Sequence, residues 1–164
     1  MKLISLDIDG VLTDYPACWL TYLADVSDRT FETTDEARHA LGNNAYELYK
    51  EAYRVSDYKA QLPMKSGSES FCRELERRGY EMIIATSRPP ISRLTTQRWL
   101  AFHRIPYRTL IEKRLDETFP HAVKDALLHV DDELIYVDLL RKHDIPAWLL
   151  EENAAYHDIL ESLP

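Results

Sequence analysis

The chain of 164 residues carries a formal net charge of −8, and hydrophobic residues make up 45% of its composition. This length fits a single domain, and the apolar content is high enough to fill a core, which argues against a disordered chain. The acidic balance argues against an extended nucleic acid as partner, because nucleic-acid binders usually present a basic surface. No apolar run approaches the roughly 20 residues that a membrane span needs, so no membrane partner is expected.

The N-terminal residues and the cysteines indicate a cytoplasmic setting. Residues 1–4 run into a predicted strand that carries Asp7 and Asp9, and cleavage of a signal would remove these residues, so no cleaved signal is expected. Cys18 and Cys72 lie far apart and outside any Cys-x-x-Cys pair, as expected for free thiols in a reducing compartment. The sequence is compatible with a homo-oligomer.

Short apolar runs alternate with helical patterns through most of the chain. The predicted strands are Lys2–Ile8, Tyr80–Thr86, Tyr107–Ile111, Leu127–Val130 and Ala147–Leu150. The helical patterns are Ser66–Arg78, Ile91–His103, Leu115–Lys124, Leu134–His143 and Asn153–Leu160. Strands separated by helices need crossover connections, so the pattern predicts an α/β fold with a Rossmann-like parallel sheet and helices on both faces.

The segment from Tyr15 to about Leu62 breaks this alternation. It contains no convincing strand, and its helical patterns are Ala17–Val26, Asp35–Leu41 and Ala45–Tyr58. We interpret residues 15–62 as a helical insertion after the first strand, and residues 1–14 and 63–164 as the α/β core. Tyr46, Tyr49 and Tyr53 form a stripe at helical spacing, which favours a buried helix face over a platform for stacking a base.

Polar residues follow the predicted strands at the edge where an open parallel sheet binds its ligands. They are Asp7 and Asp9 at the end of the first strand, Thr86, Ser87 and Arg88 at the end of the second, Lys113 after the third, and Asp131 and Asp132 at the end of the fourth. Residues i and i+2 of an extended strand face the same way, so Asp7 and Asp9 can reach one site.

Carboxylates, a hydroxyl and a cation at one edge match the needs of phosphoryl transfer through an aspartyl phosphate. A phosphate dianion repels a carboxylate nucleophile, and Mg²⁺ between them removes this repulsion. A lysine and a hydroxyl can bind the remaining phosphate oxygens. A second carboxylate can protonate the leaving oxygen and later activate water. The sequence therefore predicts a magnesium-dependent phosphomonoester hydrolase.

The motif Asp7-x-Asp9-Gly10-Val11-x-x-Asp14 resembles the first signature of the haloacid dehalogenase superfamily of phosphatases. Three later segments resemble the other signatures in the same order, namely Ile83–Arg88, Lys113 and His129–Glu133. The resemblance implies that Asp7 is the nucleophile and Asp9 the acid/base. It also implies a metal held by the Asp7 side chain, the Asp9 backbone carbonyl and Asp132, with Asp131 nearby.

Two phosphate-binding assignments rest on placement. Lys113 directly follows a strand, whereas Lys124 lies late in a predicted helix, where a solvated lysine is typical, so Lys113 is favoured. The planar guanidinium of Arg88 suits an anion such as phosphate, but it could equally pair with a carboxylate of the insertion. Thr86 and Ser87 are the expected hydroxyl ligands of the phosphate.

The resemblance also suggests substrates. The insertion resembles the small helical cap of such phosphatases, and the first signature looks most like the deoxyribonucleotidase branch, which implies a nucleoside monophosphate or a similar small phosphate ester. The stretch Thr86-Ser87-Arg88-Pro89-Pro90 resembles instead the phosphatase domain of polynucleotide kinase–phosphatases, which implies a polynucleotide 3′ end. A sugar phosphate is a further alternative. A phosphoacceptor signalling domain is the non-enzymatic alternative, but the middle strand Tyr80–Thr86 ends without an acceptor aspartate.

Overall fold

The computed structural model describes residues 2–151 and 156–164. The chain divides into two compact units. The first comprises Met1–Thr13, Met64–Arg88 and Ile105–Pro164, and the second comprises Asp14–Pro63 and Pro89–Arg104. Within the part of the chain that is described, no helix has both the length and the apolar content to cross a membrane.

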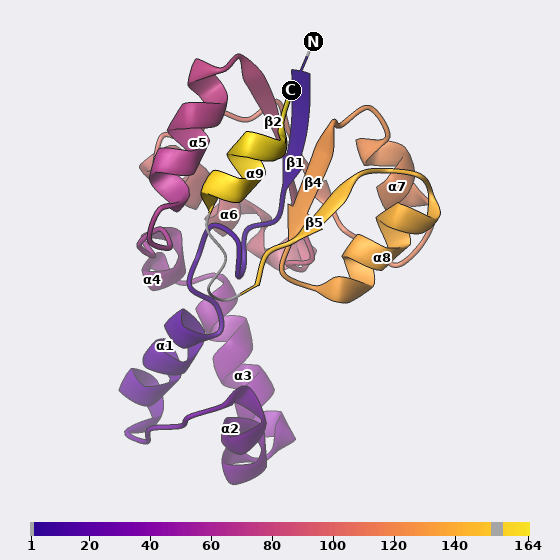
Figure 1. Ribbon diagram of the computed structural model, residues 1–164. Coiled ribbons are helices and arrows are strands. Elements are labelled where there is room, and N and C mark those ends of the chain that lie inside the picture. Colours follow the sequence, from indigo (N-terminus) through magenta and orange to yellow (C-terminus); the bar gives the residue numbers. More distant parts are fainter. Residues whose placement is uncertain (1, 152–155) are drawn as a thin grey trace. The chain divides into compact units, whose positions relative to one another are not determined.

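The first unit contains a five-stranded parallel sheet with helices around it (Figure 1). Its strands are β1 (Lys2–Leu6), β2 (Tyr80–Thr86), β3 (Thr109–Glu112), β4 (Leu128–Asp131) and β5 (Ala147–Leu149). Its helices are α5 (Ser68–Arg77), α7 (Thr118–Val123), α8 (Leu134–Lys142) and α9 (Tyr156–Ser162). The predicted α/β fold with a Rossmann-like parallel sheet is confirmed, and the strand ends differ from the predicted ones by at most two residues. Of the predicted helix Asn153–Leu160, the first three residues lie outside the described ranges.

The strand order is β3-β2-β1-β4-β5. The chain therefore runs from β1 to β2 and β3 on one side and then crosses to β4 and β5 on the other. In a sheet of this kind, the connections after β1 and β4 leave in opposite directions and open a crevice beyond the carboxyl ends of these strands. That switch point is where a ligand site is expected.

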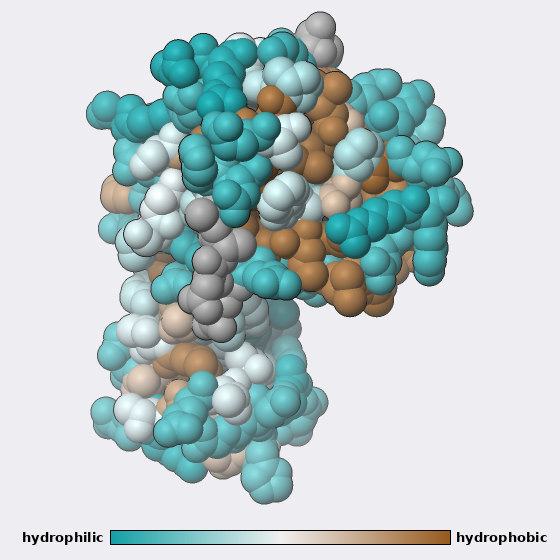
Figure 2. Space-filling model, in the orientation of Figure 1, coloured by the Kyte–Doolittle hydropathy of each residue, from teal (hydrophilic) through white to brown (hydrophobic). Residues whose placement is uncertain are grey.

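One face of the sheet is covered by α7 and α8. The core on this face is formed by Leu3, Ile83 and Ala85 of the strands and by Phe119, Val123, Ala126, Tyr136, Leu140 and Ile145. Burial of this apolar surface fixes the helices on the strands and makes a rigid platform for the strand ends. Figure 2 shows further hydrophobic side chains gathered over α8 and β5, and Leu134 and Ile135 at the start of α8 are exposed.

The second unit is helical in its described secondary structure. It contains α1 (Ala17–Ser27), α2 (Thr34–Leu41), α3 (Asn43–Arg54), α4 (Asp57–Ala60), a short 3₁₀ turn η1 (Pro90–Ser92) and α6 (Arg93–Phe102). The prediction of one helix over Ala45–Tyr58 is wrong, because Ser56 starts a new helix by accepting the Lys59 N–H on its hydroxyl at 3.0 Å. Tyr46 and Tyr53 are buried, and the Tyr46 hydroxyl accepts the indole N–H of Trp19 at 3.0 Å. The buried-face interpretation is confirmed for these two tyrosines.

Candidate active site

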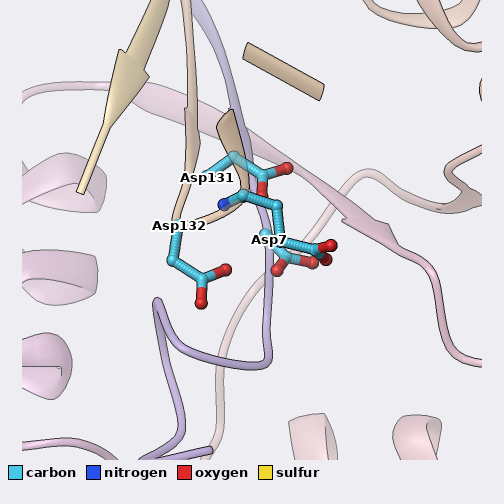
Figure 3. A group of neighbouring side chains, drawn as sticks. Asp7, Asp131 and Asp132 are labelled. Atoms are coloured by element: carbon cyan, nitrogen blue, oxygen red, sulfur yellow. The ribbon is translucent and has the colours of Figure 1, made fainter. Parts of the chain in front are cut away.

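Asp7 and Asp131 lie side by side at the switch point of the sheet. The register pairs Leu6 with Val130, and the Asp7 N–H donates to the Val130 carbonyl at 3.0 Å, so the ladder continues to the two aspartates. Figure 3 shows their carboxylates close together and the Asp132 side chain turned toward the loop after β1. The side chains of Asp7 and Asp131 are 3% and 0% exposed. Two acidic groups are therefore buried in one place and need a cation.

Lys113 supplies that cation from the end of β3. Its Nζ lies 2.7 Å from Asp131 Oδ2 and 3.1 Å from Asp7 Oδ1, and 4.2 Å from the centroid of the Tyr136 ring. Burial alone lowers the pKa of Lys113, but the charges of Asp7 and Asp131 outweigh it and raise the pKa above its ordinary value. Lys113 is therefore a cation at neutral pH. Lys124 is exposed at the end of α7, where it lines a separate surface pocket.

The Asp9 side chain forms a two-point ion pair with Arg88. Arg88 Nε and Nη2 donate to the two carboxylate oxygens at 2.7 Å each, and the Thr13 hydroxyl donates to Asp9 Oδ1 at 3.0 Å. The Arg88 side chain is only 3% exposed. A bidentate pair of this kind fixes the plane of the carboxylate as well as its position. In the structure, Arg88 therefore pairs with Asp9, a carboxylate of the loop that follows β1.

The two hydroxyl residues at the end of β2, Thr86 and Ser87, differ in their surroundings. Thr86 is buried, its hydroxyl accepts the Arg88 N–H at 3.2 Å, and its carbonyl accepts the Lys113 N–H at 2.8 Å. Thr86 therefore joins the backbones that carry Arg88 and Lys113. Ser87 is exposed. Of the two, only Thr86 has side-chain contacts that tie it to other candidate site residues within the described ranges.

Gly10 lets the loop after β1 approach the end of β4. Its φ of +87° is a conformation that residues with a side chain rarely adopt. A Cβ at this position would lie 1.9 Å from Asp132 Oδ2. Both the backbone angle and the available space therefore require glycine, and Asp132 comes into close contact with the loop that carries Asp9.

Donors from other parts of the first unit hold three successive carbonyls of this loop. Lys65 Nζ donates to the Gly10 carbonyl at 3.0 Å, and the Tyr156 hydroxyl donates to the Val11 carbonyl at 2.5 Å. The Leu12 carbonyl accepts the Lys65 N–H at 2.8 Å and the Ser68 hydroxyl at 3.2 Å. The loop between Asp7 and Asp14 is thereby fixed at the sheet edge, and sequence reasoning gave no sign of these supports.

Four carboxylates are close enough to hold a metal ion. Asp7, Asp131, Asp132 and Glu133 each offer an oxygen within 4.8 Å of the others. The oxygens of Asp131 already accept three hydrogen bonds, from the Glu133 N–H, His129 and Lys113. Asp132 Oδ1, by contrast, is buried without a hydrogen-bond partner among the described residues. A buried acceptor without a partner costs free energy of folding unless it binds a ligand. Carboxylate oxygens are the ligands that Mg²⁺ prefers, so this donor set fits magnesium.

Glu133 is a member of this group that the sequence interpretation did not assign. It directly follows the paired aspartates, and its Oε1 lies 3.9 Å from Lys113 Nζ. Burial, and then the negative charges of Asp131 and Glu133, raise the pKa of Asp132 to about 6. Burial also raises the pKa of Asp7, against the opposing effect of Lys113. Burial and the neighbouring negative charges therefore disfavour full ionisation of the metal-free site.

These raised pKa values predict that the metal-free protein loses stability as the pH rises. The folded pKa values of Asp7 and Asp132 lie above the unfolded value of about 4, so the folded state binds more protons in between. Their unfavourable contribution is absent at low pH and, for Asp132, is complete once the pH has passed about 6. Magnesium needs ionised carboxylates, so we expect it to raise the melting temperature more at neutral than at acidic pH.

Thermal melts of the wild type and of Asp132→Asn test this expectation. Without metal, we expect the variant to melt higher than the wild type at about pH 7.5 and to melt with it at about pH 5, where Asp132 is largely neutral. Millimolar magnesium should stabilise the wild type and leave the variant nearly unchanged. Equal melting temperatures at both pH values, with or without magnesium, would contradict the assignment of Asp132.

Solved structures share this fold over nearly the whole chain. A hydrolase from Streptococcus pneumoniae TIGR4 is similar over 98% of this chain and 100% of its own, with a TM-score of 0.69 and 15% identity. A HAD family enzyme from Bacteroides thetaiotaomicron, in complex with magnesium and inorganic phosphate, is similar over 97% of this chain and 98% of its own, with a TM-score of 0.55 and 12% identity. In the Pnkp1/Rnl/Hen1 complex, 47% of one chain is similar to 94% of this chain, with a TM-score of 0.58 and 17% identity.

The fold is therefore that of the haloacid dehalogenase-like hydrolases. Neither a protein-family model nor a curated protein matches the sequence of the chain. Because the identities to the solved structures are low, these likenesses establish the fold, and the activity has to be argued from the side chains at the strand ends.

Proposed function

We propose that the chain is a magnesium-dependent phosphomonoester hydrolase that works through an aspartyl phosphate on Asp7. One observation carries the proposal, the buried Asp7 carboxylate 3.1 Å from the Lys113 ammonium within a group of four carboxylates. An acidic group of this kind, held beside a buried lysine at the ligand-binding edge of a parallel sheet, suits attack on a phosphate. Burying these charges costs free energy of folding, which a merely structural role would not require.

In the first step, an oxygen of Asp7 attacks the phosphorus and the bond to the leaving oxygen breaks. Lys113, whose Nζ lies 3.1 Å from Asp7 Oδ1, would bind a phosphate oxygen and offset the negative charge that gathers there. Asp7, Asp132 and the Asp9 carbonyl would hold the magnesium ion, with Glu133 and Asp131 beside them. When bound, the ion supplies the positive charge that lets carboxylate and phosphate approach each other.

Asp9 is the proposed acid/base of both steps. It gives its proton to the leaving oxygen, and it then takes a proton from the water that attacks the phosphorus and restores Asp7. The two-point contact with Arg88 favours the ionised carboxylate, which is the form that accepts a proton from water. Acting as the acid requires this contact to loosen, and the phosphate of a bound ester can draw the guanidinium of Arg88 toward itself.

The substrate that we propose is a small phosphate ester such as a nucleoside monophosphate. The net charge of −8 suits a small ester bound through a metal better than a long polyanion. The resemblance of the first signature to the deoxyribonucleotidase branch points the same way. Tyr46 and Tyr53 do not contribute to this choice, because both are buried in the interior of the second unit.

A polynucleotide 3′-end phosphatase is the second candidate. The candidate is favoured by Arg88, which belongs to the stretch Thr86-Ser87-Arg88-Pro89 that resembles such phosphatases. Arg88 is buried and pairs with Asp9, the proposed acid/base. A chain of the Pnkp1/Rnl/Hen1 complex shares the fold, which is compatible with this candidate. A sugar phosphate stays as a further substrate class.

A release assay for inorganic phosphate, run on the purified chain with magnesium, tests these proposals. The substrates are nucleoside monophosphates, sugar phosphates and an oligonucleotide with a 3′-phosphate. We expect the fastest turnover with a nucleoside monophosphate and none after a chelator removes the metal. Fast turnover of a sugar phosphate or of the 3′ end alone would move the substrate to that class. A chain that takes up phosphate from acetyl phosphate, keeps it and hydrolyses no ester would instead support the phosphoacceptor domain.

A further inference from the structure

A second buried polar pair, Ser5 and His129, lies beneath the candidate active site. The register pairs Ser5 of β1 with His129 of β4, and both residues are 0% exposed. Asp7 and Asp131 come two residues later on the same strands, so the four side chains share one face of the sheet. His129 is thus a core residue of β4, and both nitrogens of its imidazole have hydrogen-bond partners.

The contacts of His129 determine its tautomer. Its Nε2 lies 2.8 Å from Asp131 Oδ2, and its Nδ1 lies 2.9 Å from the Ser5 hydroxyl. A carboxylate only accepts, so in the neutral imidazole Nε2 carries the hydrogen and Nδ1 accepts the hydrogen of the Ser5 hydroxyl. Phe119 meets the imidazole edge-on, with ring centroids 5.3 Å apart. The ring is therefore held in its position and in its orientation.

The same oxygen of Asp131 binds both His129 and Lys113. Lys113 Nζ lies 2.7 Å from Asp131 Oδ2, and it reaches Asp7 Oδ1 at 3.1 Å. The other oxygen, Asp131 Oδ1, accepts the Glu133 N–H at 3.0 Å. A rotation of the Asp131 carboxylate would break the contact with His129 or with the Glu133 N–H, and it would carry the ammonium away from Asp7.

We propose that His129, held by Ser5, is a positioning residue of the site. It fixes Asp131 so that Asp131 keeps the Lys113 ammonium beside Asp7, where the oxygens of a phosphate would arrive. His129 acts through Asp131 and does not touch the substrate. The proposal rests on the proposed function, because it assigns Lys113 to phosphate binding. Loss of a residue that orients a binding side chain through a hydrogen bond typically lowers affinity or activity by about 10–100-fold.

An ordinary core role makes a different prediction. An apolar residue could fill the space between the sheet and Phe119 at similar stability, and buried polar groups often cost stability compared with such a residue. If His129 only fills space, replacements that fold should retain full activity. If it positions Asp131, activity should follow the hydrogen bond to Asp131 and not the melting temperature.

The test compares His129→Gln with His129→Asn. The glutamine amide reaches the position of Nε2 and can donate to Asp131, whereas the shorter asparagine reaches only the Ser5 side of the imidazole. In the release assay we expect His129→Gln to stay within about threefold of the wild type and His129→Asn to lose about 10–100-fold in kcat/KM. His121→Gln, which changes an exposed histidine of α7, is the matched control and should leave kcat/KM unchanged.

Two further measurements separate this inference from the proposed function. Calorimetry of inorganic phosphate binding with magnesium needs no turnover, and we expect His129→Asn to weaken binding while His129→Gln retains it. Nitrogen NMR of the wild type at neutral pH should show the Nε2–H tautomer of His129. A wild type that hydrolyses no ester would refute the proposed function and leave both measurements valid. Equal phosphate affinity in the two folded variants, or an Nδ1–H tautomer, would overturn the inference, and failure of both variants to fold would assign His129 to the core.

Discussion

Replacing Asp7 by asparagine abolishes turnover of every phosphomonoester while the chain keeps its fold. Asparagine has the shape of aspartate, but its amide oxygen is a poor nucleophile and cannot form the acyl phosphate. We expect kcat to fall at least about 10⁴-fold, as when other enzymes lose their nucleophile. The release assay with the best substrate of the screen measures this loss.

The same variant should be at least as stable as the wild type in the absence of metal. Burial and the neighbouring carboxylates Asp131, Asp9 and Asp132 raise the pKa of Asp7, so its charged form is disfavoured in the folded state. Asparagine removes that charge, and Lys113 retains its contact with Asp131 at 2.7 Å. Thermal melts at neutral pH check this, and Asp138→Asn, at an exposed position in α8, is the control for loss of a carboxylate. Residual turnover close to that of the wild type would contradict the role of Asp7.

Trapping the covalent intermediate tests the role of Asp7 independently of the release assay. When the reaction of the wild type is quenched with acid, phosphate should be attached to the peptide that contains Asp7, and the Asp7→Asn chain should carry none. Phosphate on another aspartate would move the nucleophile to that residue. No bound phosphate in a chain that turns over would favour direct attack by water.

The sheet and the gathering of the site at its edge could be predicted because both follow from local pattern and one rule of topology. Apolar runs separated by helical patterns define the strands, and the carboxyl ends of parallel strands share an edge. Asp7, Lys113 and Asp131 therefore come together although they lie far apart in the chain. The prediction needed no knowledge of the order of the strands.

Contacts that depend on strand order and on turns could not be predicted. His129 meets Ser5 only because β1 and β4 are neighbours in that register, and local pattern does not contain the strand order. Arg88 reaches Asp9 through a loop whose course depends on the positive φ of Gly10. The break in the predicted helix Ala45–Tyr58 could not be predicted from spacing, because the helical spacing continues across the new start at Ser56.

Replacing Lys113 by methionine should reduce both activity and stability strongly. Methionine matches the length of the aliphatic stem but leaves the buried carboxylates of Asp7 and Asp131 without their shared cation. Breaking a buried ion pair by removing one partner typically costs about 3–5 kcal/mol of the free energy of unfolding. A loss of about 10²–10³-fold in kcat/KM is expected as well, as when another preorganised donor at a reacting group is lost. Denaturant unfolding and the release assay measure the two effects.

A second substitution separates the two effects of Lys113→Met. Adding Asp131→Asn removes one of the two uncompensated charges, so we expect it to restore part of the stability. It cannot restore the cation, so the activity should stay low. If the double variant regained activity together with stability, the loss in Lys113→Met would come from unfolding alone and Lys113 would have no role at the phosphate.

Lys124→Met is the matched control because it changes the other lysine that the sequence offers. Lys124 is exposed at the end of α7, and surface substitutions of this kind usually change stability by less than about 0.5 kcal/mol. We expect Lys124→Met to retain the kcat/KM and the phosphate affinity of the wild type. The opposite result, an active Lys113→Met and an inactive Lys124→Met, would move the phosphate to the end of α7. The contacts of Lys113 with Asp7 and Asp131 would then serve only to balance charge within the sheet edge.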